Sequence, residues 1–241
     1  MLRANSLVGN APGAAVLETT LMGCALRFEV VARVAVTGAD AVVRVDRAPA
    51  VAGVVIEVPA GAVLDIGRAR HGVRSYLAVA GGLDVEPVLG SRSTDTLSGL
   101  GPPKLADGMT LPIGTAVGPP SAGGVAALNP SGDLVLGVRL GPRDDWFVAA
   151  GLFSSAYTVS PLSNRVGCRL AGSALTRTRP GELSSEGIVL GAVQVPANGE
   201  PLIFLADHPT TGGYPVIGVV DDVTPLAQAR PGTTVRFREL D

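Results

Sequence analysis

Lysine is almost absent from this sequence. Lys104 is the single lysine, and every other basic residue is an arginine. The phosphate-cradling loop G-x-x-x-x-G-K-[ST] requires a lysine before Ser or Thr, and no such loop occurs. This absence excludes an ATP site of the standard P-loop kind. It also means that the chain does not itself carry biotin, because no lysine lies in an attachment setting.

Metal-ligating residues are equally scarce. The only cysteines are Cys24 and Cys168, with no C-x-x-C pattern, and the only histidines are His71 and His208. A zinc site needs about four clustered ligands, whereas these residues are widely separated in the sequence. We therefore predict no metal site, and we interpret the cysteines as small buried hydrophobic residues.

The sequence has neither a strong charge nor a long apolar run. The 19 basic and 21 acidic residues leave a net charge of -2, so the basic surface of a nucleic-acid-binding protein is missing. The most apolar stretch, residues 21–36, is broken by Arg27, Glu29 and Arg33 and cannot span a membrane. The first residues lack the apolar core of a signal peptide. We expect a cytoplasmic protein that binds neither nucleic acid nor membrane.

Turn residues, in contrast, are abundant. Glycine occurs 32 times and proline 19 times, between short segments rich in Val, Ile and Leu, and this pattern is typical of many short β-strands. The fold class is therefore predicted as mainly β. The predicted strands are 15–20, 25–30, 32–37, 41–45, 54–58, 63–66, 74–80, 134–140, 188–195, 202–206, 216–220 and 233–238.

Composition also divides the chain. Residues 101–133 are rich in Gly, Pro, Ala and Ser, as in a connection between domains. We predict an N-terminal β domain over residues 1–115, a linker over 116–133 and a C-terminal β domain over 134–241. Short helices are predicted at 2–8, ended by Gly9, at 144–147 and at Thr224.

The densest polar segment, residues 207–215, lies between two apolar strands, which is a common position for reactive groups. Asp207 can orient His208 or act as a base. Hydroxyl and unhindered N–H groups for an anion come from Thr210, Thr211, Gly212, Gly213 and Tyr214. The alternative is an ordinary β-turn with its histidine in water.

Three further segments carry candidate residues. Arg165 can pair with a carboxylate or phosphate, and the neighbouring Asn164 can hydrogen-bond an amide. Arg92 and Ser93 lie among several hydroxyl residues at 90–96. Glu186 precedes an apolar strand and can serve as an acid or base. Each has a structural alternative, namely a solvated turn for the arginines and a strand-entry position for Glu186.

Two familiar catalytic patterns are missing from the sequence. There is no G-x-S-x-G turn and no pair of histidines at metal-binding spacing, so a serine hydrolase or a zinc hydrolase has no support. The remaining histidine, His71, follows two arginines and is predicted at a solvated hairpin tip.

Taken in order, several segments resemble one protein family, from residues 4–10 to the C-terminus. The matching motifs are SYLAVAGGLD at 75–84, LGSRSTD at 89–95, SNRVGCRL at 163–170, SEG at 185–187, GAVQVP at 191–196 and DHPTTGGYP at 207–215. The sequence is similar to the C subunits of bacterial ATP-dependent 5-oxoprolinases. This family is also labelled allophanate hydrolase subunit 2 or biotin-dependent carboxyltransferase-like.

The resemblance implies two cyclophilin-like β-barrel domains with a site in the cleft between them. It also implies a complex with a homologous B subunit and with an A subunit, which together hydrolyse 5-oxo-L-proline to L-glutamate. ATP would be the cofactor, with or without Mg²⁺ shared with the partner subunits. Acid, base and charge-stabilising roles are assigned to Asp207, His208, Glu186 and Arg165. Substrate binding is assigned to Arg92, Ser93, Asn164, Thr210, Thr211, Gly212, Gly213 and Tyr214.

Members of this family usually begin with a further segment that contains a D-x-G-R-x-G run and a G-V-P-x-S-G-A-M-D run. This sequence starts at Met1, after that point, so we expect the first barrel to lack its usual N-terminal segment. A start codon assigned too late is our preferred explanation over a natural shortening that impairs catalysis.

Two other functions stay open. One is a regulator without turnover that binds a B-subunit homologue acting as a kinase inhibitor. The other is a carboxyltransferase or allophanate-hydrolase-type subunit of urea metabolism, which works with biotin carried by another protein.

Overall fold

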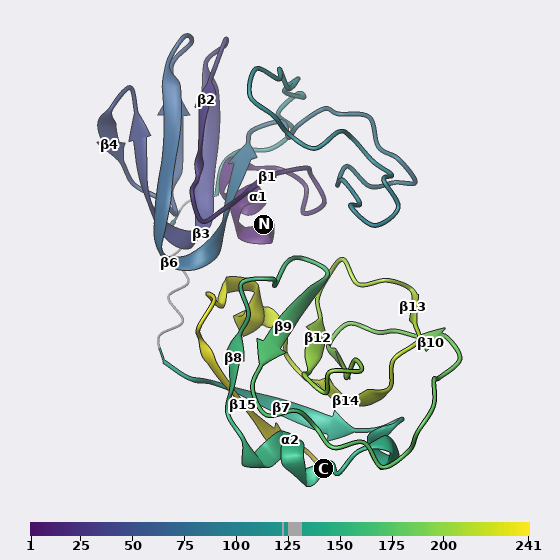
Figure 1. Ribbon diagram of the computed structural model, residues 1–241. Helices are drawn as coiled ribbons and strands as arrows, with labels where there is room; N and C mark the ends of the chain where they lie inside the picture. The colour runs from purple at the N-terminus through teal and green to yellow at the C-terminus, as the bar shows by residue number, and fades with distance from the viewer. Residues whose placement is uncertain (122, 125–131) are drawn as a thin grey trace. The chain divides into compact units, whose positions relative to one another are not determined.

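The computed structural model describes residues 1–121, 123–124 and 132–241. The chain divides into two compact units, residues 1–129 and 130–241 (Figure 1). The predicted linker, 116–133, contains residues 122 and 125–131, which lie outside the described residues, and its bounds stay a prediction. Its first part packs with unit 1, because the N–H of Ser121 donates to the carbonyl oxygen of Leu7 at 3.1 Å.

The described residues of unit 1 form one helix and a six-stranded antiparallel sheet. The strand order is β1-β6-β3-β4, with β2 also paired with β6 and β5 with β3. The two longest strands, β3 and β6, therefore pair with all the others, and their inward side chains form the core together with side chains of β1, β5 and the connecting turns. The elements are α1 (Leu2–Val8), β1 (Leu17–Thr20), β2 (Cys24–Arg27), β3 (Ala32–Val45), β4 (Ala48–Ala50), β5 (Val55–Val58) and β6 (Val63–Val79).

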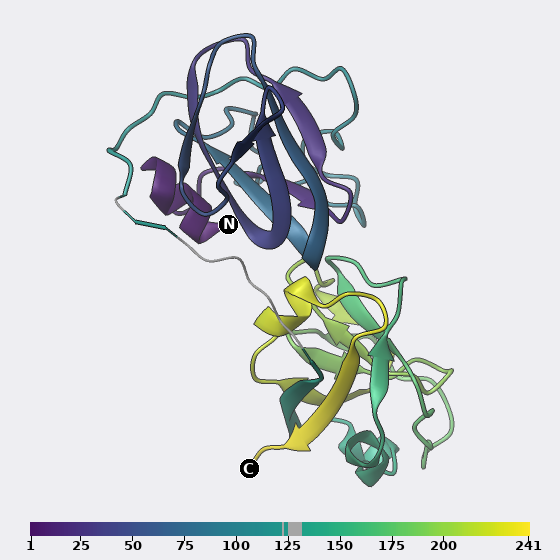
Figure 2. The same ribbon diagram turned by 90° about the vertical axis from the view of Figure 1, so that its left-hand side faces the viewer.

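Helix α1 covers residues 2–8, as predicted. It lies beside the sheet in Figure 2. Its buried face, Ala4, Leu7 and Val8, packs against Ala35 of β3 and Ala78 of β6. The helix ends at Gly9, which has the left-handed backbone (φ 77°) that a C-cap requires. Both the helix and its glycine stop are thus confirmed.

The long strands β3 and β6 correct the sequence prediction, which divided each of them in two. Both run through the predicted gap because β3 accommodates register shifts near Gly38, where φ is 101°. A Cβ at Gly38 would come within 2.4 Å of the carbonyl oxygen of Arg74, so glycine permits this close approach. His71 lies inside β6, opposite Asp40, and the prediction that it lies at a hairpin tip is therefore wrong.

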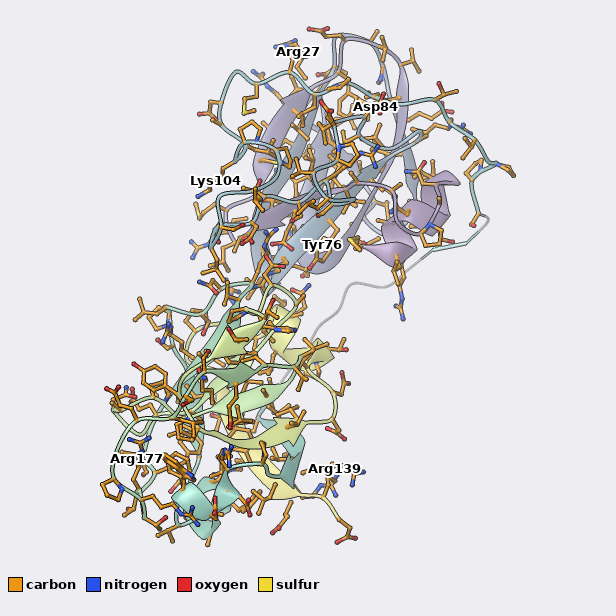
Figure 3. All side chains as sticks on the ribbon, turned by 90° about the vertical axis from the view of Figure 1, so that its right-hand side faces the viewer. Arg27, Tyr76, Asp84, Lys104, Arg139 and Arg177 are labelled. Atoms are coloured by element: carbon orange, nitrogen blue, oxygen red, sulfur yellow. The ribbon has the colours of Figure 1, made fainter. Side chains whose placement is uncertain are left out.

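A long irregular excursion follows β6. It begins and ends at the same place, because Leu83 bridges Ile113 and the N–H of Asp84 donates to the carbonyl oxygen of Pro112 at 2.9 Å. Asp84 and Lys104 both lie on this excursion (Figure 3). The candidate segment 90–96 belongs to it, so it lies in unit 1.

Unit 2 is a closed seven-stranded barrel with the order β11-β12-β9-β8-β15-β7-β14. Pairing is antiparallel except between β15 and β7, which run parallel. The core fills the barrel and includes Tyr157, Ile203 and Ile217, which are fully buried. The strands are β7 (Leu134–Leu140), β8 (Tyr157–Val159), β9 (Gly167–Ala171), β10 (Glu186–Gly187), β11 (Ala192–Gln194), β12 (Leu202–Phe204), β13 (Thr211–Gly212), β14 (Val216–Val220) and β15 (Thr234–Glu239). Its helices are η1 (Asp144–Trp146), α2 (Ala150–Ser154) and η2 (Thr224–Gln228).

The mainly β fold class is confirmed. Unit 2 is a closed barrel, whereas the described residues of unit 1 form an open sheet, because each outer strand pairs with only one of the two long strands. Among the described residues, no helix has the length and apolar character needed to cross a membrane.

Candidate functional site

The central contact of the candidate site joins Arg165 and Asp207. Arg165 lies two residues before β9 and Asp207 three residues after β12, and these strands pair with Gly167 opposite Phe204. The pairing brings both residues to one end of the barrel. The N–H of Asp207 donates to the carbonyl oxygen of Arg165 at 3.1 Å, and Nε of Arg165 lies 2.8 Å from Oδ2 of Asp207. About a third of each side chain is exposed, so the pair is accessible to a ligand.

His208 follows directly, and its ring contacts a backbone carbonyl group. Its Nδ1 lies 2.8 Å from the carbonyl oxygen of Pro209. A carbonyl oxygen can only accept, so a hydrogen bond here requires a hydrogen on Nδ1, which leaves Nε2 as the ring nitrogen that can exchange a proton with a ligand. The ring packs edge-on against Phe204, with centroids 6.4 Å apart. Asp207 pairs with Arg165 and not with this ring, so the idea that Asp207 orients His208 is corrected.

Asn164 has a structural role in this geometry. Its Oδ1 accepts from the N–H of Val166 at 2.9 Å and from the N–H of Gly167 at 3.2 Å. An asparagine that bonds to its own backbone in this way fixes a turn. The turn sets the position of Arg165 at the entry to β9, so Asn164 supports the site through its neighbour.

The Thr210–Gly213 segment is more regular than a loop. Thr211 and Gly212 form strand β13, paired with Gly187 and Glu186 of β10 (Figure 1). In the part of the chain that the structure describes, the backbone N–H groups of Thr210 and Gly213 have no acceptor within the protein. Backbone donors without a protein acceptor, beside the exposed hydroxyl groups of Thr210 and Thr211, suit an oxyanion.

Glu186 holds a position next to this segment, and its partner is Arg143, which the sequence reasoning missed. Nε of Arg143 donates to Oε2 of Glu186 at 3.1 Å, and Nη2 donates to Oε1. This hydrogen bonding holds the pKa of the Glu186 carboxyl below its ordinary value and raises the pKa of Arg143. Glu186 is thus a carboxylate near neutral pH, a state in which it acts as base or charge and not as acid. No local motif marked Arg143; only its place after β7 could have suggested it.

Gln194 is a second residue that the sequence reasoning did not select. It is buried on β11, and its Nε2 donates to the carbonyl oxygen of Tyr214 at 3.0 Å. A Cβ at Gly212 would lie 2.8 Å from that same nitrogen. Gln194 therefore supports the segment 207–215 from the barrel side, and the missing side chain of Gly212 leaves room for the glutamine amide. A glutamine in an apolar strand was the available signal.

Arg92 and Ser93 are in unit 1, whereas the Arg165–Asp207 contact is in unit 2. Nε of Arg92 donates to the carbonyl oxygen of Val85 at 2.7 Å, and the N–H of Ser93 donates to the hydroxyl of Ser91 at 3.1 Å. Their roles in a site shared by both units stay a prediction. Within the described ranges, no group of three or more His, Cys, Asp or Glu residues is placed to hold a metal ion.

Several known proteins are similar to this chain. The chain is 41% identical to the C subunit of the 5-oxoprolinase of Escherichia coli strain K12, over 97% of this chain and 78% of that protein. The crystal structure of TTHA0988 has a TM-score of 0.84 and 36% identity, covering 98% of this chain and 48% of that one. The urea carboxylase of Kluyveromyces lactis has a TM-score of 0.84 and 28% identity, covering 99% of this chain and 24% of that one.

The chain thus spans about three quarters of the curated relative and about half or less of the solved chains. A family model described as "Carboxyltransferase domain, subdomain A and B" matches residues 1–239, which is nearly the entire sequence. The chain therefore belongs to the carboxyltransferase-domain family, subdomains A and B.

Proposed function

We propose that this protein is the C subunit of an ATP-dependent 5-oxoprolinase, which hydrolyses 5-oxo-L-proline to L-glutamate together with an A and a B subunit. The observation that carries the proposal is the 41% identity to a protein named as the C subunit of 5-oxoprolinase, extended over 97% of this chain. The segments of the candidate site lie within the aligned length, so the likeness covers the region where chemistry is expected.

The chemistry of the substrate fits the groups at the end of unit 2. 5-Oxoproline carries a carboxylate and a cyclic amide, and opening the ring develops negative charge on the amide oxygen. The guanidinium of Arg165 and the backbone donors of Thr210 and Gly213 suit such charges. His208 can take or give a proton at Nε2, and Asp207 fixes the guanidinium of Arg165.

An amide is a poor electrophile, and ATP would supply a phosphoryl group that turns its oxygen into a better leaving group. The exposed hydroxyl of Thr211 and the neighbouring N–H groups fit a phosphate oxygen chemically. A phosphate bound by backbone N–H and hydroxyl groups does not require a P-loop lysine, and the sequence contains no P-loop.

The test is reconstitution. The chain is coexpressed with A-subunit and B-subunit homologues, and release of glutamate from 5-oxoproline is measured with and without ATP. Turnover that depends on ATP and on this chain supports the proposal. A stable complex with no turnover of 5-oxoproline contradicts it and favours a regulator.

The solved urea carboxylase gives the reason for a second substrate in the same assay. Urea is offered with a biotin-carrying partner and bicarbonate. Consumption of ATP with urea, and none with 5-oxoproline, would assign the chain to urea metabolism instead.

A further inference from the structure

The Thr210–Gly213 segment is fixed at its two ends, and in its middle Gly212 lies against the side chains of Gln194 and Ile188. At its start, Asp207 is tied to Arg165 through both backbone and side chain. At its end, Pro215 leads directly into β14, whose first residue, Val216, is buried. Between these points the segment leaves the barrel, and its strand partner there is β10.

Strand β10 is itself outside the barrel. It follows residues 172–185, which contain no strand or helix, and pairs with β13 alone. The pairing of β10 with β13 is only two residues long, extended by the N–H of Ile188 donating to the carbonyl oxygen of Thr210 at 2.9 Å. Two such short strands have little stability of their own. Ile188, which follows β10, is buried in an apolar cluster with Leu202 and Phe204, and a side-chain contact of Glu186 holds β10 itself.

Arg143 supplies that contact from the barrel. Its own backbone is fixed, because the N–H of Arg143 donates to the carbonyl oxygen of Val216 at 3.0 Å and the N–H of Gly141 to that of Ile217 at 3.0 Å. From this anchored position its guanidinium binds both oxygens of Glu186. Glu186 lies opposite Gly212 in the β10–β13 pair. A continuous path thus runs from β14 through Arg143 and Glu186 to Gly212.

We infer that Arg143 is a positioning residue, which acts through Glu186 and the β10–β13 pair to hold the backbone donors of Thr210 and Gly213 where they bind an oxyanion of the substrate. The oxyanion would be a carboxylate or a phosphate oxygen. This inference rests on the proposed function for the identity of the substrate, but not for the support that Arg143 gives to the segment.

The first experiment needs no turnover. Arg143→Met is compared with Arg139→Met in the full chain, and backbone hydrogen exchange is measured by NMR. Arg139 is a matched control, because it is an exposed arginine on β7, four residues before Arg143. We expect exchange at Ile188 and Gly212 to become about tenfold faster in Arg143→Met and to stay unchanged in the control.

The same samples are titrated with inorganic phosphate, and the amide shifts of Thr210 and Gly213 are followed. Binding in the wild type and in Arg139→Met, with at least about a threefold weaker affinity in Arg143→Met, is the expected result. Equal exchange and equal phosphate affinity in the two variants would overturn the inference.

The second experiment uses the reconstituted complex. Arg143→Met is expected to lower kcat/KM for 5-oxoproline about 10-fold to 100-fold, mostly through kcat, as for misplaced transition-state donors. Arg143→Lys should recover part of the loss, and the exchanged pair Arg143→Glu with Glu186→Arg should recover more than either single variant. A purely structural defect would lower the amount of folded protein without this rescue, and would contradict the inference.

The two proposals fail separately. If the wild-type complex does not hydrolyse 5-oxoproline, the proposed function is lost, while the exchange and phosphate measurements still decide the role of Arg143. If the complex is active and Arg143→Met keeps wild-type kinetics and exchange, only the role of Arg143 is lost.

Discussion

Gln194 Nε2 occupies the space that a side chain at Gly212 would need, with 2.8 Å between that nitrogen and an ideal Cβ. The glutamine uses this position to donate to the carbonyl oxygen of Tyr214. Gly212 is therefore required for packing and not for an unusual backbone angle.

Gly212→Ala should push the amide of Gln194 away from Tyr214 and cost about 1 kcal/mol of stability through the lost hydrogen bond. Urea unfolding measures it. Gly187→Ala is the control, because it lies in the paired strand and a Cβ there meets nothing within 4 Å. The double variant Gly212→Ala with Gln194→Ala should relieve the clash. Equal stability of the two alanine variants would contradict this explanation.

The ion pair of Glu186 makes local stability depend on pH. Its pKa is below the ordinary value of 4.5 because Arg143 hydrogen-bonds the charged form. A lowered pKa in the folded state stabilises above the unfolded pKa, and the contribution disappears as pH falls through the folded value. Besides Arg143, the acidic Asp145 lies within electrostatic reach of the pair.

We expect the β10–β13 pair to open as pH falls below about 4.5, and Glu186→Gln to remove this dependence. NMR shifts of Gly187 and Gly212 follow the opening. A wild-type profile identical to that of Glu186→Gln would show that the ion pair does not hold these strands.

The Arg165–Asp207 pair is the most direct test of the catalytic assignment. Arg165→Ala and Asp207→Asn should each lower turnover of the reconstituted enzyme at least about 100-fold, while the complex still assembles. Arg169→Ala is the control, since that arginine lies on the adjoining strand β9 with an exposed side chain. Full activity in both site variants would remove this pair from the site.

The buried hydroxyl of Tyr157 predicts a stabilising substitution. It is fully buried in the barrel core, and over the described residues its hydroxyl has no hydrogen-bond partner. Burial also raises its pKa. An unpaired buried hydroxyl costs free energy, so Tyr157→Phe should raise the free energy of unfolding by about 1 kcal/mol. Thermal unfolding measures the change, and a lower Tm would indicate that the hydroxyl contributes favourably.

Sequence reasoning identified elements whose signals are local. Strands β7 and β14 and helix α1 have the predicted bounds, because each is an apolar segment ended by turn residues. It missed β8 and β9, which are short and lie among Ser, Gly and Arg residues that obscure their alternation. It also divided β3 and β6, because the charged residues at 68–74 suggested a turn where the bulged ladder continues.

In the candidate site, too, sequence patterns identified single residues but not the contacts between them. Arg165 and Asp207 were both selected, but their contact depends on the pairing of β9 with β12, which no local pattern specifies. Arg143 lies 43 residues before Glu186 in the chain, so only the fold could associate them. Pairs of this kind become visible once the register of the barrel is known.

The parallel pairing of β15 with β7 has a consequence for biosynthesis. These are the last and first strands of unit 2, and they meet with Val235 opposite Leu134. While β15 is still inside the ribosome, the growing barrel keeps two unpaired edges and an uncovered interior. The six described strands of unit 1 all precede Leu134, so they leave the ribosome before any strand of unit 2. Unit 2 must wait for its final strand, and aggregation of incomplete chains should start there.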